Sequence, residues 1–137
     1  MNPIHQLMHR LHNPDLGLLF IRLALGVVFI NSGWAKVTNL EGVVGFFATL
    51  GLPAFLAYLV AYVEFLGGIA FVLGILVRYF GLLTAIIMAV AICKVHWANG
   101  FNPADGGYGY VLVFLLASLA IVTMGAGSYS LARLFRK

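Results

Sequence analysis

A single acidic residue, Glu64, stands near the middle of the long apolar run formed by residues 53–78. A run of about 20 apolar residues is long enough to cross the hydrocarbon core of a bilayer, which is roughly 30 Å thick. A lone carboxylate at that depth costs on the order of 3 kcal/mol, so it must face protein or water, pair with a cation, or carry a proton. Glu64 can therefore act as an acid, a base or an ion-pair partner inside a membrane.

The preceding apolar run, over residues 16–37, contains a cation that can pair with this acid. At about 1.5 Å of rise per residue, Arg22 is expected about 9 Å from one end of its helix and Glu64 about 15 Å from the opposite end of the next helix. An extended arginine side chain covers the remaining offset. We therefore predict an Arg22–Glu64 pair, which reduces the cost of placing both charges in the membrane.

Several further polar side chains are expected at similar depths in the outer half of the membrane. We predict that they form one polar cavity between Glu64 and the outer surface, in which a histidine can exchange protons near neutral pH. The predicted catalytic residues are Glu64 and His96, and the residues predicted to contact a bound molecule are Arg22, Asn31, Lys36, Tyr62, Lys94, Trp97 and Tyr108. Such a cavity suits the carbonyl groups of a quinone. The alternative is a buried network of ion pairs that only fixes how the helices pack.

The same residue types restrict the cofactors that one chain can hold. His96 is the only histidine within a predicted span, so the chain cannot supply two histidine ligands to a membrane haem. His5, His9 and His12 share one face of a short helix without a carboxylate or cysteine to complete a metal site, and Cys93 is the only cysteine. We predict no haem, flavin or metal site, and expect any redox cofactor to be a diffusible quinone or to belong to a partner.

Composition defines the class of protein that must position these residues. The 137 residues are 63% hydrophobic and 9% charged, whereas a soluble domain has about 25% charged residues. The net charge of +4 comes from cations that flank apolar runs, which is a topology signal and does not indicate nucleic-acid binding. We expect one all-α integral membrane domain over residues 1–137, embedded in the lipid bilayer.

The apolar runs predict a four-helix transmembrane bundle. The spans are expected at about 16–37, 54–76, 79–97 and 108–124, with glycines on the facing sides of the first two for close packing. A short amphipathic helix should precede the first span, over residues 3–12, and an interfacial helix should follow it, around residues 43–50.

Two details of this bundle depend on its basic residues. Lys94 and His96 are about 200° apart on a regular helix, so both can face the centre only if the helix unwinds there. Basic residues also predict that both termini are cytoplasmic, because most of them flank the same side of the spans: Arg10, Arg78, Arg133, Arg136 and Lys137, with Lys36 and Lys94 on the other side.

The chain resembles the DoxX family of small bacterial four-span membrane proteins, from about Leu16 to Leu131. The resemblance rests on the segments RLALGVVFINSGWAKV, GLPAFLAYLVAYVEFLGGIAFVLGILVRYFG, GYGY and GAGSYSL, and on an ordered set of residues: Arg22, Gly33, Lys36, Glu64, Gly67, Gly68, Gly74, Arg78 and His96. The chain departs from the family pattern at Ala126 and Ala132, where proline and aspartate are frequent. This departure concerns only the C-terminal turn.

The resemblance implies a place in the bacterial inner membrane and a link to redox chemistry, since some relatives are quinone-linked subunits and others are membrane partners of redox and stress-defence enzymes. It favours a component of such a system, with a redox partner protein and a quinone-like ligand, and leaves open whether the chain is itself an oxidoreductase subunit. Two alternatives from other classes are a non-catalytic membrane scaffold and a small transporter that acts as a homodimer.

Overall fold

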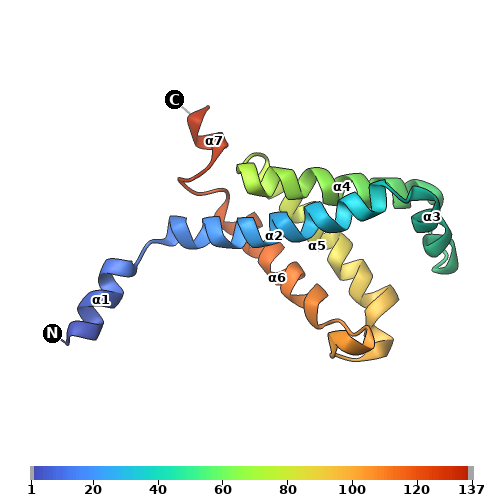
Figure 1. The fold of residues 1–137 in the computed structure, drawn as a ribbon, viewed down its shortest axis with the longest axis horizontal. Coiled ribbons are helices and arrows are strands. Elements are labelled where there is room, and N and C mark those ends of the chain that lie inside the picture. Colours follow the sequence, from blue (N-terminus) through green and yellow to red (C-terminus); the bar gives the residue numbers. More distant parts are fainter. Residues whose placement is uncertain (1, 136–137) are drawn as a thin grey trace.

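The computed structural model describes residues 2–135, which are helical and contain no strand, as predicted (Figure 1). Arg136 and Lys137, two of the cations used to predict topology, lie outside the described residues. The α-helices are α1 (Pro3–Leu11), α2 (Pro14–Val37), α3 (Leu40–Thr49), α4 (Ala54–Leu73), α5 (Val77–Ala91), α6 (Gly109–Met124) and α7 (Leu131–Leu134). Between α5 and α6 lie a π-helical turn, η1 (Ile92–His96), and two 3₁₀ turns, η2 (Trp97–Asn99) and η3 (Pro103–Asp105).

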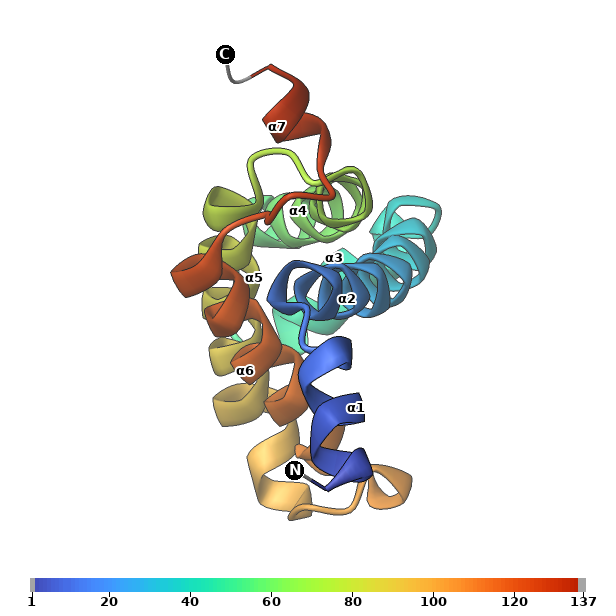
Figure 2. The same cartoon turned by 90° about the vertical axis from the view of Figure 1, so that its left-hand side faces the viewer.

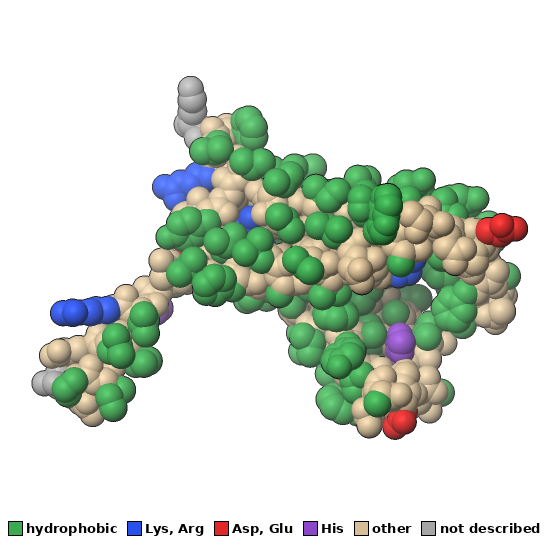
Figure 3. All heavy atoms as spheres, viewed as in Figure 1, with side chains coloured by type: hydrophobic (Ala, Val, Ile, Leu, Met, Phe, Trp, Pro, Cys, Tyr) green, Lys and Arg blue, Asp and Glu red, His purple; other side chains and the backbone are tan. Residues whose placement is uncertain are grey.

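Three helical segments have the length and composition needed to cross a membrane. They are α2, α4 and the continuous helix Val77–Asn99, which joins α5 to η1 and η2. The fourth predicted span corresponds to α6, which is apolar but has only 16 residues, so its crossing of the membrane stays a prediction. The surface agrees with a membrane setting, because hydrophobic side chains cover the helices and charged ones lie mainly toward their ends (Figure 3).

The long helices form two pairs, in which α2 packs on α4 and α5 packs on α6. The pairs meet at one end of the molecule and diverge toward the other, where α3 and the α5–α6 connection lie (Figures 1 and 2). The chain enters α2 and leaves α6 at the end where the pairs meet. The core joins both pairs through Leu18, Leu25, Phe29, Phe71, Val77, Met88 and Ile121.

Glycines allow α2 and α4 to approach closely, as the sequence predicted. A Cβ atom added at Gly68 would lie 2.5 Å from the backbone nitrogen of Ile30, and one added at Gly33 would overlap the backbone nitrogen of Phe65. These contacts leave no room for a side chain at either position. The two backbones therefore touch along the length of the pair, which fixes how far each helix is rotated toward the other.

We expect Gly33→Ala to destabilise the protein by roughly 1–3 kcal/mol, because the added methyl group meets backbone that cannot rotate away. The matched control is Gly17→Ala in the same helix, where nothing lies within 4 Å of the added Cβ. That control should be neutral or slightly stabilising, since alanine is the better helix former. Thermal unfolding of the two variants in one detergent tests this, and equal melting temperatures would contradict the close approach.

Local signals set most helix ends. The side chain of Asn2 accepts a hydrogen bond from the Ile4 N–H and caps α1, and Asn13 caps α2 in the same way through the N–H of Leu16. α4 ends at Leu73, three residues before the predicted end, because Gly74 adopts a left-handed conformation with φ of 75°. Because α4 ends early, its last backbone carbonyls lie inside the bundle without a helical donor. They are therefore available to a charged side chain.

Candidate functional site

The acid Glu64 forms an ion pair with Lys36. The carboxylate is buried, at 3% exposure, and its Oε2 atom accepts hydrogen bonds from Lys36 Nζ at 2.7 Å and from the Ser32 hydroxyl at 3.0 Å. Lys36 Nζ also donates to Ser32 Oγ at 2.7 Å, which closes a triangle of three polar groups. We call these three residues the Glu64 cluster. It satisfies the requirement that a carboxylate at this depth has a cation beside it.

Aromatic residues one to two helical turns from the Glu64 cluster, on α2 and α4, indicate the direction in which the cluster faces. Ser32 and Lys36 lie one and two turns beyond Phe29 on α2, and Glu64 lies two turns before Phe71 on α4. Phe29 contacts both Phe71 and Phe114 of α6, with ring centroids 6.1 Å apart in each pair. The cluster therefore continues the face of the α2–α4 pair that is turned toward α6. Lys36 keeps 28% of its side chain exposed there.

Arg22 is held by backbone carbonyls. Its side chain is 1% exposed, and all three guanidinium nitrogens donate hydrogen bonds. Nε donates to the Phe71 carbonyl at 2.9 Å and Nη2 to the Val72 carbonyl at 3.2 Å, both at the C-terminal end of α4. Nη1 donates to the carbonyls of Ala126 and Tyr129, each at 2.8 Å, in the segment after α6. Arg22 thus ties α2, α4 and the C-terminal segment together.

The predicted Arg22–Glu64 pair is therefore wrong. The last carbonyls of a helix lack intrahelical partners and carry the negative end of the helix dipole, so they attract a cation. Because α4 ends at Leu73, such carbonyls lie beside Arg22 and take its donors. Lys36, nearer the other end of α2, reaches Glu64 instead. The expectation that Glu64 is paired with a cation is confirmed, but depth along the membrane identified the wrong cation.

His96 and two predicted ligand contacts organise the connection between α5 and α6. The helix departs from α geometry at η1, which contains Lys94 and His96, but Lys94 is exposed, so the departure does not turn both side chains toward the centre. The Gly106 carbonyl lies 2.7 Å from His96 Nδ1, and since a carbonyl only accepts, Nδ1 donates this hydrogen bond. The ring of Trp97 stacks on Tyr108, with centroids 5.2 Å apart and planes at 20°.

The remaining predicted contacts do not join the Glu64 cluster. Asn31, Tyr62 and Lys94 are exposed. Tyr62 lies about 200° around α4 from Glu64, as the two-residue spacing requires, and lines an apolar groove of about 460 Å³ together with Phe55, Tyr58, Leu59, Val63, Leu66 and Phe80. No salt bridge connects Lys94 to the cluster within residues 2–135. The single polar cavity was predicted from depth alone, and depth does not specify the direction in which a side chain points.

Three hydroxyl-bearing residues with structural roles were not predicted from the sequence. Ser32 belongs to the Glu64 cluster, and its position one turn before Lys36 was the available signal. Thr84 and Ser118 are fully buried and joined by a hydrogen bond of 2.9 Å, which links α5 to α6. A hydroxyl can be hidden in an apolar helix because it also bonds to the backbone of its own helix, as Thr84 does with the Gly81 carbonyl.

Helices of this length and composition define a multi-pass membrane protein, and comparison with known sequences identifies its family. The DoxX family model matches residues 17–97. The chain is 32% identical over 107 residues to "Putative oxidoreductase CatD" of Bacillus subtilis, covering 78% of this chain and 79% of that protein. It is 30% identical over 133 residues to "Inner membrane protein YqjF" of Escherichia coli, covering 90% and 95%. No solved structure matches. The chain belongs to the DoxX family.

Proposed function

We propose that this DoxX protein is an inner-membrane component of a redox or stress-defence system and binds a quinone-like molecule at the Glu64 cluster. The observation that carries the proposal is the Lys36–Glu64 ion pair between two membrane-crossing helices, at 2.7 Å, with Lys36 28% exposed. Ionisable residues within a membrane are costly and most often mark a ligand or proton pathway. The names of the relatives from B. subtilis and E. coli support a redox role and an inner-membrane location.

The residues of the cluster suit the head group of a quinone. The Lys36 ammonium has three donors and uses two of them within the cluster, so a third is available to a quinone carbonyl. Reduction of a quinone to a quinol takes two electrons and two protons. In this proposal a partner protein supplies the two electrons and the two protons come from the adjoining water. The Lys36–Glu64 pair passes one proton to the carbonyl oxygen that Lys36 contacts, and the other carbonyl oxygen takes its proton from water as both become hydroxyl groups.

The positions of the chain ends support the proposed topology. Asp15 at the start of α2 accepts a hydrogen bond from the hydroxyl of Ser128, which follows α6. The start of α2 and the end of α6 therefore lie at the same end of the molecule. Arg78 and Arg133 lie at this same end, lining one hollow. Since basic residues favour the cytoplasmic side, we place both termini in the cytoplasm and the Glu64 cluster toward the periplasmic half of the membrane.

A membrane scaffold is the second candidate, and the divergence of the helix pairs favours it. The α2–α4 pair and the α5–α6 pair run apart toward the α3 end of the molecule (Figure 1). Two pockets in the described part of the chain, of about 650 and 460 Å³, are lined by residues other than those of the Glu64 cluster. In this second view a helix of a partner protein fills the space between the pairs, and the Glu64 cluster orients α2 against α4.

Mass spectrometry of an organic extract from the purified protein separates the two candidates. We expect wild-type protein to carry a quinone at close to one molecule per chain, and Glu64→Gln to carry at least roughly tenfold less, because the variant removes a charged hydrogen-bonding group. The matched control is Glu41→Gln, an exposed acid at the start of α3, which should retain the quinone.

Only bulk phospholipid in the extracts of all three proteins would contradict quinone binding and favour the scaffold. Equal quinone in wild type and Glu64→Gln would contradict the assignment to the Glu64 cluster. Size-exclusion chromatography in the same detergent confirms that each variant is folded before its extract is compared.

A further inference from the structure

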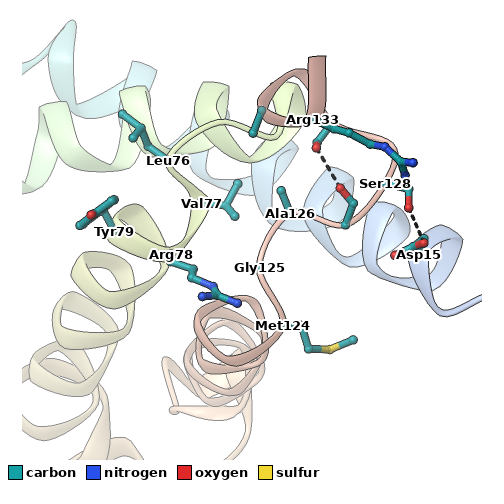
Figure 4. Close-up of a pocket in the computed structure, with 13 residues that line it drawn as sticks. Asp15, Leu76, Val77, Arg78, Tyr79, Met124, Gly125, Ala126, Ser128 and Arg133 are labelled. Carbon is teal, nitrogen blue, oxygen red and sulfur yellow. Dashed lines mark hydrogen bonds between the residues drawn. The ribbon is translucent and has the colours of Figure 1, made fainter. Parts of the chain in front are cut away.

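We propose that the hollow at the end where the helix pairs meet is a binding site for the phosphate group of an anionic phospholipid. The hollow has a volume of about 650 Å³ and lies between the start of α5 and the segment that follows α6 (Figure 4). This volume is in the range of small-molecule sites. The site is separate from the Glu64 cluster, since none of the three residues of that cluster lines it.

Two arginines give the hollow its charge. Arg78 belongs to the first turn of α5 and Arg133 to α7, and both line the hollow (Figure 4). Within the described part of the chain, neither forms a salt bridge. The only acid in the lining is Asp15, so two guanidinium groups and one carboxylate leave one net positive charge. A guanidinium presents paired donors that match two oxygens of a phosphate, which makes arginine a better phosphate ligand than a point charge.

The segment that forms one wall of the hollow is held in place at three points. Arg22 binds the carbonyls of Ala126 and Tyr129, as described above. The Ser128 hydroxyl donates to the carboxylate of Asp15, and the Ala132 N–H donates to the Gly74 carbonyl at 3.2 Å. The segment from Gly125 to Ala132 is therefore a fixed wall, and it leads into Arg133, which lines the hollow together with Arg78.

The apolar part of the lining indicates a lipid. Leu76, Tyr79 and Met124 line the same hollow and are exposed, so a ligand there meets cationic and apolar surface together. An anionic phospholipid has this combination of phosphate and acyl chains. The hollow also lies at the ends of the membrane-crossing helices, at the depth of lipid head groups, on the side where basic residues favour the anionic cytoplasmic leaflet.

Lipid binding to the delipidated full chain in detergent tests the proposal, with native mass spectrometry as the measurement. The probes are phosphatidylglycerol, phosphatidylcholine and inorganic phosphate. We expect wild type to bind phosphatidylglycerol more tightly than phosphatidylcholine. Arg133→Gln and Arg78→Gln/Arg133→Gln should each bind phosphatidylglycerol at least roughly tenfold more weakly, through loss of charge-assisted hydrogen bonds. Arg10→Gln, an exposed arginine of α1, is the matched control and should bind as wild type does.

Each other outcome overturns a stated part of the proposal. Equal binding of the two lipids to wild type would show that the phosphate charge is not what the hollow recognises. Unchanged phosphatidylglycerol binding by both variants would show that the lipid binds at a site other than this hollow. Binding of inorganic phosphate that displaces phosphatidylglycerol and is lost in the double variant would identify a soluble phosphate ligand in place of a lipid. Arg133 is exposed on a short terminal helix, so Arg133→Gln remains informative even if the double variant is unstable.

Discussion

Arg22→Met should lower the free energy of unfolding by on the order of 4 kcal/mol or more, which we expect to be the largest effect of any single substitution in this chain. The substitution keeps a long apolar side chain and removes the donors for four backbone carbonyls. A buried acceptor left without a donor costs about 1–3 kcal/mol. The helix turn offers no replacement, because the N–H groups of Gly74 and Ile75 both donate to Ala70.

The loss should concern the C-terminal segment in particular. Without Arg22, the carbonyls of Ala126 and Tyr129 lose a shared donor, so the segment after α6 should become sensitive to limited proteolysis in detergent. Thermal unfolding measures the stability change, and Arg10→Met, which removes an exposed arginine of α1, is the matched control. A melting temperature for Arg22→Met within a degree or two of that control would show that Arg22 does not hold the bundle together.

Lys36→Met should cost more stability than Glu64→Gln, although the two substitutions break the same ion pair. Glu64 is 3% exposed, so removing Lys36 leaves a buried carboxylate with only the Ser32 hydroxyl beside it, at a cost of about 3–5 kcal/mol. Removing the charge of Glu64 instead leaves Lys36, which is 28% exposed and can extend its ammonium toward the membrane surface. That loss should be nearer 1 kcal/mol.

A double-mutant cycle measures this asymmetry. Lys36→Met combined with Glu64→Gln should recover most of the stability that Lys36→Met loses, since no unpaired charge remains inside the bundle. Lys94→Met, an exposed lysine of η1, controls for the loss of a lysine as such. If Glu64→Gln lowers the stability as much as Lys36→Met does, then the partial exposure of Lys36 does not allow its ammonium to reach the membrane surface. The cycle also supports the quinone test, which requires that Glu64→Gln folds.

The helices and their membrane character could be predicted from the sequence, because both depend on local properties. Apolar runs of sufficient length predicted the long helices, and their composition predicted the membrane as the solvent. The start of α1 could be predicted from Asn2, whose side chain bonds to the backbone two residues away. The first span was predicted to begin at about residue 16, whereas α2 begins at Pro14, where Asn13 caps it. Glycine spacing predicted the close contact of α2 with α4, since residues three and four apart share a helix face.

The candidate site could be predicted only in part. The sequence indicated that the charge of Glu64 must be compensated, by a cation, a proton or polar surroundings, because the cost of a lone charge in hydrocarbon does not depend on the fold. It also placed Lys36 among the candidate contacts. It could not choose between Arg22 and Lys36, because that choice depends on where α4 ends and on which groups it leaves without partners.

Tertiary structure decided the choice through the segment after α6. This segment returns over the end of the bundle and adds the carbonyls of Ala126 and Tyr129 to those of α4, so that Arg22 finds four acceptors in one place. These acceptors are about 50 and more than 100 residues away along the chain, and no local pattern signals them. The sequence by itself thus determined the helices, the membrane as their surroundings and the need to compensate the charge of Glu64. The three-dimensional packing determined the partner, because backbone carbonyls of distant segments compete for the same cation.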